Sequence, residues 1–186
     1  MVAQQNVLGV CNFDMLFQYA HYGWEGSAHD GKVLGDALGK GFPLIPNKYY
    51  LADAGYALRW YTLTPYRSVR YHLKEWESVA NKPQNKQELF NLRHAQLRNV
   101  IERIFGVLKK RFKILTRMES FAFIAKQKDN IGQIDIVECC FLLHNFIRTK
   151  TDYEDEFYNE AMYDNNDFAN ELHVNEEPDN VHNQDL

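Results

Sequence analysis

The sequence predicts a single α/β domain, in which helices flank a mixed β-sheet, followed by an acidic tail. Two observations predict this class: short segments rich in β-branched and aromatic residues come first, and long segments with helical periodicity come last. The expected order of strand, strand, helix, strand, helix and helix suits a layered α/β domain. The chain has 186 residues, of which 45% are hydrophobic, so it is able to bury a substantial core.

The first expected elements form a β-hairpin. The segments NVLGVCNF (6–13) and MLFQYAHYGW (15–24) are short and rich in β-branched and aromatic residues, which is typical of strands. Residues 12–14 supply the turn between them. A short helix is expected next, within GSAHDGKVLGDALG (26–39). Its candidate caps are Ser27 or Asp30 at the start and Gly39 or Gly41 at the end.

The next strand is expected from Tyr49 to Ala52, and Asp53 follows it directly. A carboxylate at the carboxyl end of a strand lies at the sheet edge where α/β proteins assemble their sites. We expect residues 57–86 to form a long polar connection that holds one short strand at SVRYHL (68–73).

Two helices are expected in the second half of the chain. The first covers residues 86–115, and Gly106 weakens it near its end. Its expected apolar face consists of Leu97, Ile101, Ile104 and Leu108. The second covers residues 131–148. Its expected buried residues are Ile134, Val137, Phe141, Leu142 and Ile147.

Cysteine usage and the N-terminal sequence favour a soluble, intracellular protein. The chain has three cysteines, Cys11, Cys139 and Cys140, and this odd number does not fit a disulfide framework. Residues 1–10 lack the basic and apolar segments of a signal peptide, and no apolar run is long enough to cross a membrane. We therefore expect no membrane partner.

The charges are segregated along the chain. Residues 1–151 contain all 21 basic residues and 13 acidic ones, a net charge of +8, whereas residues 152–186 contain 12 acidic residues and no Lys or Arg. The basic part suggests a polyanionic partner. We expect a domain over residues 1–151 and a disordered acidic tail over residues 152–186. The alternative is an interaction segment, or a phosphate mimic that folds back on the basic helix.

Two carboxylates have the placement that metal chemistry needs. Asp53 at a strand end and Glu102 within the long helix are residue types that bind Mg²⁺ through oxygen, and nucleases often use two such ions. A helix laid across the sheet allows Glu102 to reach the site of Asp53. The spacing leaves another interpretation equally open, in which Glu102 only pairs with Arg98 at i, i+4.

Five sequence blocks occur in order across residues 5–150: GWEGSAHDGKVLGDAL, KYYLADAGY, TPYRSVRYHLKEW, ELFNLRHAQLRNVIERIFGVLKKRFKIL and ECCFLLHNFIR. They resemble consecutive blocks of the Harbinger (PIF) transposase superfamily, which includes domesticated Harbinger-derived nucleases. The resemblance implies an RNase H-like DDE endonuclease domain, a hydrolase acting on phosphodiester bonds of DNA. It also implies a divalent metal, Mg²⁺ or Mn²⁺, and a location in the nucleus, with the cytoplasm as the alternative.

The resemblance also assigns the site residues. In that family the D-A-G-Y block holds the second catalytic Asp and the N-V-I-E-R-x-F-G block holds the catalytic Glu, so Asp53 and Glu102 are expected to be catalytic metal ligands. The family's first catalytic Asp lies on a strand upstream of the stretch matching QQNVLGVCNFD. The chain therefore resembles an N-terminally truncated domain with impaired two-metal cleavage. Asp14 is a candidate substitute, but it aligns with a strand-turn position.

Basic residues cluster on the same helix as Glu102. Those predicted to contact the phosphate backbone of DNA are Arg93, Arg98, Arg103, Lys109, Lys110 and Arg111. The alternative is a solvated helix face. Elements of this family commonly also encode a Myb-like DNA-binding protein, which is a second candidate partner.

Two residue pairs have simpler interpretations. His29 and Asp30 lie near a helix start, where capping is expected rather than metal or acid–base chemistry. Cys140 and His144 lie at i, i+4 on one helix, and two ligands without a second pair do not make a zinc site, so a core helix is expected.

The sequence therefore supports two functions from different classes. The first is a metal-dependent DNA endonuclease or transposase of the Harbinger type, impaired by the lack of the first Asp. The second is a non-catalytic, domesticated relic that acts as a DNA- or protein-binding adaptor through the same basic face.

Overall fold

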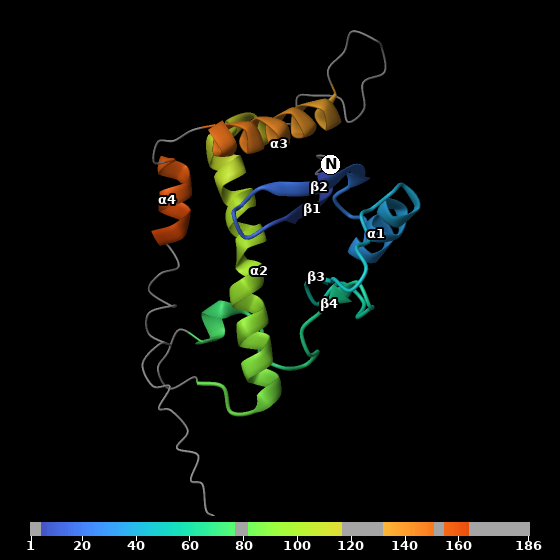
Figure 1. The fold of residues 1–186 in the computed structure, drawn as a ribbon, viewed down its shortest axis with the longest axis vertical. Helices are drawn as coiled ribbons and strands as arrows, with labels where there is room; N and C mark the ends of the chain where they lie inside the picture. Colours follow the sequence, from blue (N-terminus) through green and yellow to red (C-terminus); the bar gives the residue numbers. More distant parts are fainter. Residues whose placement is uncertain (1–4, 77–81, 117–131, 151–154, 164–186) are drawn as a thin grey trace, which may run out of the picture.

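The computed structural model describes residues 5–76, 82–116, 132–150 and 155–163 (Figure 1). Within these residues, helices pack around two separate two-stranded sheets, and the long helix α2 contacts both of them. The α/β class is confirmed. The expected mixed sheet is divided in two, because the described strands of one pair form no ladder with those of the other.

The first sheet is the predicted hairpin of β1 (Gln5–Cys11) and β2 (Phe17–Glu25), which pair antiparallel. Asn12 stabilises its turn, because its Oδ1 accepts a hydrogen bond from the N–H of Leu16 at 2.9 Å. Side chains of β1 alternate between two apolar clusters. Val7 and Cys11 pack against the main core, whereas Leu8 and Val10 pack against a smaller cluster around α1.

Helix α1 (Asp30–Gly39) forms where it was predicted, but its N-cap is His29 rather than Ser27 or Asp30. Nδ1 of His29 accepts a hydrogen bond from the N–H of Gly31 at 3.1 Å, as a capping side chain should. The helix ends at Gly39, and Gly41 then adopts a φ of +90°, which favours glycine.

The second sheet is a parallel pair of β3 (Tyr50–Leu51) and β4 (Thr62–Leu63). β3 lies in the predicted strand segment. The predicted strand at 68–73 is wrong: Ser68 has a φ of +61°, which interrupts an extended chain, and the segment runs into the 3-10 helix η1 (Leu73–Trp76). β4 forms earlier in the same connection.

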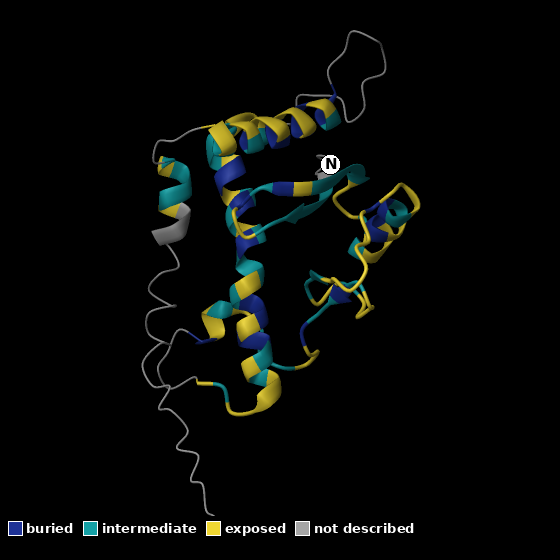
Figure 2. Ribbon diagram, viewed as in Figure 1, coloured by how far each residue is buried: buried dark blue, intermediate teal, exposed yellow. Residues whose placement is uncertain are grey.

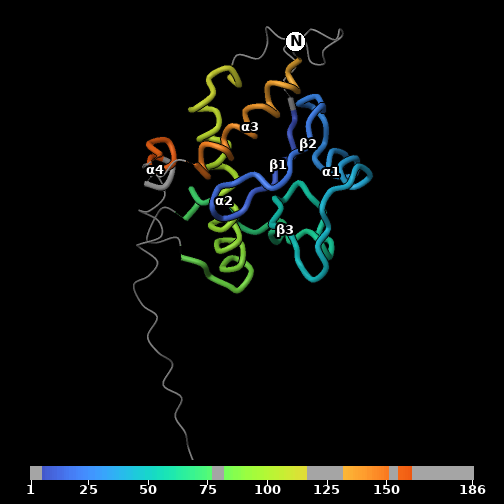
Figure 3. The backbone as a smooth tube through the Cα atoms, turned by 45° about the horizontal axis from the view of Figure 1, so that its top comes forward, coloured from blue at the N-terminus to red at the C-terminus, as the bar shows by residue number. Residues whose placement is uncertain are grey.

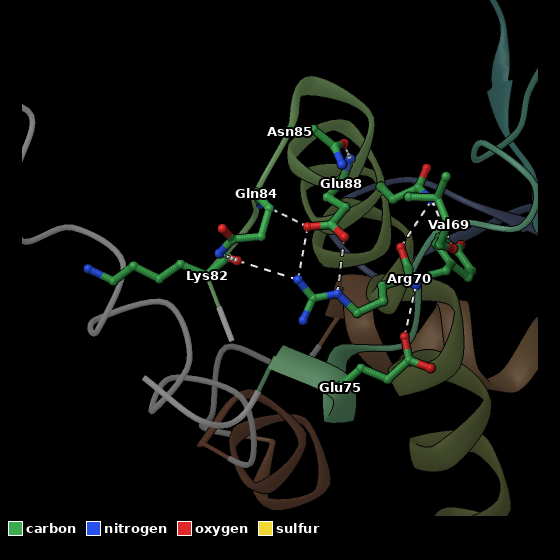
Figure 4. A network of polar contacts seen from close by, with 9 residues as sticks. Val69, Arg70, Glu75, Lys82, Gln84, Asn85 and Glu88 are labelled. Atoms are coloured by element: carbon green, nitrogen blue, oxygen red, sulfur yellow. Dashed lines mark hydrogen bonds and ion pairs between the residues drawn. The ribbon is translucent and has the colours of Figure 1, made fainter. Parts of the chain in front are cut away.

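Helix α2 (Lys86–Arg111) is continuous through Gly106 and is followed by the 3-10 helix η3 (Lys113–Thr116). Asn85 caps its start by accepting a hydrogen bond from the N–H of Glu88 at 2.9 Å. Oε2 of Glu88 in turn accepts hydrogen bonds from Arg70 Nη2 at 2.9 Å and from the N–H of Gln84 at 2.7 Å (Figure 4). This network fastens the long connection to the first turn of α2.

Helix α3 (Gln133–Lys150) closes the main core over β2 and α2. The expected burial of Val137 and Phe141 is confirmed, but Leu142 is 65% exposed. Buried and exposed residues alternate along α3 (Figure 2). His144 and Asn145 bind the backbone of the hairpin, and the buried face runs through Ile136, Val137, Cys140, Phe141 and His144.

Residues 155–163 of the expected disordered tail instead include a helix, α4 (Glu156–Tyr163), which packs beside α2 (Figures 1 and 3). Asp155 forms an ion pair with Arg111, and Glu160 pairs with Lys110 at 2.8 Å. The Phe157 and Tyr158 side chains pack against the main core, which explains why this acidic segment is ordered. Residues 164–186 lie outside the described residues. None of the described helices is long and apolar enough to cross a membrane.

Candidate active site

Asp53 lies just beyond β3, at the sheet-edge position that the sequence predicts. Its Oδ1 accepts a hydrogen bond from the N–H of Gly55 at 2.8 Å, a turn that fixes the side chain. Its Oδ2 accepts a hydrogen bond from Arg98 Nη2 at 3.1 Å. With 33% of its side chain exposed, the carboxylate is both oriented and open to solvent.

Arg98 joins Asp53 to Glu102. Its Nη1 donates a hydrogen bond to Glu102 Oε1 at 2.7 Å, so the i, i+4 pair considered as the simpler interpretation is present. The same guanidinium, only 18% exposed, also holds Asp53. The two carboxylates predicted from the sequence therefore lie around one cation. The side chain of Glu102 is 64% exposed and faces solvent beside this cation.

The neighbouring groups favour the charged form of Arg98. Burial lowers the pKa of Arg98, but Tyr71, Glu102 and Asp53 outweigh it and raise the pKa above its ordinary value. Burial raises the pKa of Tyr56, and the carboxylates of Asp30 and Asp53 raise it further. The site thus combines two carboxylates, a permanent cation and a neutral phenol.

Asp30 is a third carboxylate beside Asp53, although the sequence pattern indicated only a capping role for it at the helix start. Its Oδ1 accepts a hydrogen bond from Asn6 Nδ2 at 3.3 Å. A Cβ atom added to Gly55 would lie 3.0 Å from both Asp30 Oδ2 and Asp53 Oδ1. Glycine at position 55 therefore leaves room for two carboxylates to approach each other. The sequence signal that could have identified Asp30 is its place in the block GWEGSAHDGKVLGDAL, the first of the five blocks that resemble the transposase family.

The donor atoms fit a divalent ion in kind, because Asp30, Asp53 and Glu102 offer only carboxylate oxygens, which Mg²⁺ and Mn²⁺ accept. Across the described ranges, no three His, Cys, Asp or Glu side chains converge closely enough to form a metal centre. The Arg98 guanidinium occupies the position between Asp53 and Glu102 that a metal ion would take, so a metal ion there must displace it. Asp14 lies in the hairpin turn, exposed, with Asn12 as its hydrogen-bond partner.

Asp30, Asp53 and Arg98 border a groove of about 370 Å³ between β1 and β3. Its walls are apolar over most of their length and come from α1, α2 and both sheets. The polar site therefore opens onto an apolar cavity, rather than onto a basic channel.

The six basic residues predicted to contact DNA do not share one exposed face. Arg93 and Lys109 are exposed, Arg103 is half-buried, and Arg98 is engaged by the carboxylates. Arg111 is 9% exposed, pairs with Asp155 and donates to His144 Nδ1 at 3.1 Å. The side chain of Lys110 contacts Glu160. The acidic helix α4 thus covers the C-terminal part of this basic cluster.

The two pairs with simpler interpretations lie as expected. His29 caps α1. Cys140 and His144 are buried in the core, 5% and 1% exposed, and Nε2 of His144 donates a hydrogen bond to the carbonyl oxygen of Met15 at 3.0 Å.

An α/β domain with carboxylates at a strand end and on a crossing helix offers the ligand type that metal-dependent nucleases use. The sequence comparison agrees with this class, because residues 4–145 match the profile of the DDE superfamily endonucleases. The match spans more than half of the chain, and the protein belongs to this family. The family normally uses a divalent metal, and the match supports a nuclease- or transposase-like function. No curated protein and no solved structure matches the chain.

Proposed function

We propose that the protein is a DNA endonuclease of the Harbinger DDE type, or its domesticated remnant, in which Asp53 and Glu102 hold a Mg²⁺ or Mn²⁺ ion. The observation that carries the proposal is the position of Arg98, which brings both carboxylates to one cation although they lie on different elements. The RNase H-like fold and the nuclear location belong to the same proposal and rest on the resemblance of the five sequence blocks.

The chain's own residues have distinct parts in this chemistry. Asp53 is held by the N–H of Gly55 and offers its Oδ2, while Glu102, on α2, contacts the other nitrogen of the same guanidinium. Arg98, once released from the carboxylates, is placed to contact a phosphate oxygen through its planar guanidinium. A bound divalent ion supplies activation of water and stabilisation of charge on the phosphate.

Cleavage is expected to be weak. Asp53 and Glu102 suffice for one loosely bound ion, whereas two-metal chemistry needs further ligands that the described residues do not bring together. Asp30 is the nearest candidate for a third carboxylate. The fold therefore supports metal binding more directly than rapid strand cleavage.

The second candidate function is a non-catalytic adaptor that binds DNA or protein, and two observations favour it. Arg98 already neutralises both carboxylates, and α4 covers Lys110 and Arg111. DNA is the proposed partner in both functions, and a Myb-like DNA-binding protein is the proposed second partner.

The test is nicking of supercoiled plasmid DNA in the presence of Mn²⁺. We expect slow nicking by the protein and none by Asp53→Ala or Glu102→Ala, while Asp14→Ala, which removes an exposed carboxylate in the hairpin turn, retains activity. Circular dichroism checks that each variant is folded. Activity that persists in Asp53→Ala contradicts the site assignment. Salt-sensitive DNA binding without nicking, in a protein that does not bind Mn²⁺, supports the adaptor function instead.

A further inference from the structure

Helix α3 has a second apolar side, which the main core does not use. Leu142, Leu143 and Phe146 are 65%, 43% and 61% exposed, and Cys139 is exposed as well. Figure 2 shows exposed residues along the length of this helix. Because the four residues follow one another at intervals of three, one and three, they lie on one side of the helix. They form an apolar stripe about two turns long.

A charged residue extends this stripe at each end. Asp135 precedes Cys139 by four residues and Lys150 follows Phe146 by four, and both charged residues are exposed. The Asp135 side chain is fixed, because its Oδ2 accepts a hydrogen bond from the N–H of Gly132 at 2.8 Å. With about 100° of rotation per residue, the six side chains fall within an arc of about 100°. We call them the α3 stripe: Asp135, Cys139, Leu142, Leu143, Phe146 and Lys150.

The α3 stripe has the same spacing in both directions along the helix, because its intervals are four, three, one, three and four residues. Two such helices that pack antiparallel, about a two-fold axis between residues 142 and 143, therefore pair the stripe with itself. In that arrangement each Leu142 faces Leu143 of the second copy, and each Cys139 faces its Phe146. Each Asp135 faces a Lys150. A parallel arrangement instead places like charges together at both ends.

We propose that the α3 stripe binds the α3 stripe of a second copy of this chain, as an antiparallel pair of helices. A two-fold interface uses the same surface on both partners, so that surface must be complementary to itself. The α3 stripe meets this condition twice, in its apolar residues and in its charges. The helix has 18 residues and is about 27 Å long, so the pair buries an area at the low end of specific interfaces. The dimer is therefore weak, with a Kd on the order of 10 µM.

Other occupants match the α3 stripe less well. DNA requires a basic surface, whereas the stripe has one acid for one base and Glu138 is exposed near it. A membrane surface also favours Lys and Arg around the apolar side chains. A helix of another protein satisfies the apolar positions, but such a pairing does not account for the identical spacing in both directions. The inference stands apart from the proposed function, since it requires neither metal nor DNA.

Sedimentation velocity of the full chain, in EDTA and a reducing agent, tests the proposal at about 1–100 µM protein. We expect a monomer–dimer equilibrium, and the reducing agent excludes disulfides of Cys139. Leu142→Glu places two charges at the centre of the dimer and should raise the Kd at least about tenfold. Leu142 is mostly exposed in the single chain, so this variant should fold, and circular dichroism checks that it does.

Two matched controls make the same change elsewhere. Leu58→Glu alters the connection between β3 and β4, where Leu58 is 64% exposed. Leu97→Glu alters α2, where the helical pattern predicted burial but Leu97 is 51% exposed. Both variants should dimerise as the unmodified protein does. A protein that stays monomeric at about 100 µM, a dimer that survives Leu142→Glu, or an equal loss in either control overturns the proposal.

Charge reversal tests the antiparallel register. Asp135→Lys and Lys150→Asp each place like charges opposite one another at both ends of the dimer, so each variant alone should dimerise about three- to tenfold more weakly. When the two variants are mixed, every lysine at these positions faces an aspartate, and the mixture should contain more dimer than either variant alone. Single variants that dimerise as tightly as the unmodified protein, or a mixture that gains no dimer, overturn the antiparallel pairing.

Discussion

Arg98 Nη2 lies 3.1 Å from Asp53 Oδ2, so a side chain of α2 holds a residue just beyond the end of β3. The same arginine reaches Glu102 through its other nitrogen, Nη1. In a site for a divalent ion this arginine is a competitor, because it satisfies the charge of both carboxylates. A divalent ion would therefore compete with Arg98 for these carboxylate oxygens.

Replacing Arg98 with Met should strengthen Mn²⁺ binding and weaken the metal-free fold. The variant removes the guanidinium that binds both Asp53 and Glu102 and so competes with a metal ion. We expect the Kd for Mn²⁺ to fall by about tenfold. We also expect the free energy of unfolding without metal to fall by about 1–2 kcal/mol, because Arg98 is largely buried whereas Glu102 is mostly exposed and contributes little.

Titration with Mn²⁺ followed by electron paramagnetic resonance measures the first effect, and urea unfolding measures the second. Arg93→Met is the control, because Arg93 is exposed on the same helix, away from the carboxylates, with Gln96 as its hydrogen-bond partner. Unchanged Mn²⁺ affinity in Arg98→Met would show that Asp53 and Glu102 do not form a shared site.

His144 should make the fold less stable as the pH falls below about 6.5, the ordinary pKa of histidine. Burial lowers the pKa of His144, and the cation Arg111 lowers it further. The hydrogen bond from His144 to the Met15 carbonyl raises this pKa, but by less than burial lowers it. The neutral ring fits both partners: Nε2 donates to the Met15 carbonyl and Nδ1 accepts from Arg111. The folded state therefore binds fewer protons than the unfolded state, and acid favours unfolding.

Urea unfolding at pH 7, 6 and 5 tests this dependence, against His144→Gln. Glutamine is able to donate and accept at the same two positions but does not titrate. We expect the loss of stability between pH 7 and 5 to be smaller in this variant, by at most about 1.4 kcal/mol per pH unit. His94, whose pKa burial also lowers, remains in both proteins and accounts for part of the residual slope. Identical slopes would assign the acid sensitivity elsewhere.

Asn145 ties the second half of the chain to the hairpin. Its Oδ1 accepts a hydrogen bond from the N–H of Phe17 at 2.9 Å, and its Nδ2 donates to the carbonyl oxygen of Phe17 at 2.8 Å. Asn145→Asp keeps the shape but places a charged acceptor beside that carbonyl. We expect a loss of about 1–3 kcal/mol in the free energy of unfolding, measured with urea. Gln18→Glu, an exposed substitution on the same strand, should cost little, and an equal loss there would indicate a general charge effect.

The local sequence patterns predicted the helices and strands better than they predicted which side chains of these elements contact one another. The hairpin, α1 and α2 follow from residue periodicity and turn residues near in sequence, so they could be predicted. The exposure of Leu142 could not, because the bond from Asn145 to Phe17 spans most of the chain. Asp30 was placed at a helix start, and its approach to Asp53 appears only when the start of α1 meets the turn at Gly55.

The charge count predicted an acidic tail but not where it would lie. A net charge carries no information about packing, whereas Phe157 and Tyr158 bring α4 onto the core and fix its acids beside α2. Part of the tail does fold back on the basic helix through two ion pairs, while its role as a phosphate mimic stays a prediction.

If DNA binds the basic cluster, as the proposed function requires, Glu160→Gln should increase the affinity. Glu160 Oε1 lies 2.8 Å from Lys110 Nζ, and both side chains are about half exposed, so losing this pair costs little stability. The freed lysine adds about one phosphate contact. We expect affinity for short duplex DNA to rise by about two- to fivefold at low salt, and the slope of log K against log salt concentration to steepen by about 0.9.

Glu156→Gln makes the same change in net charge on α4, where no ion pair with Lys or Arg is described for Glu156. Fluorescence anisotropy over a salt series compares the two variants. An equal gain in both would mean that net charge alone controls binding, and no gain in either would mean that DNA does not contact this end of α2.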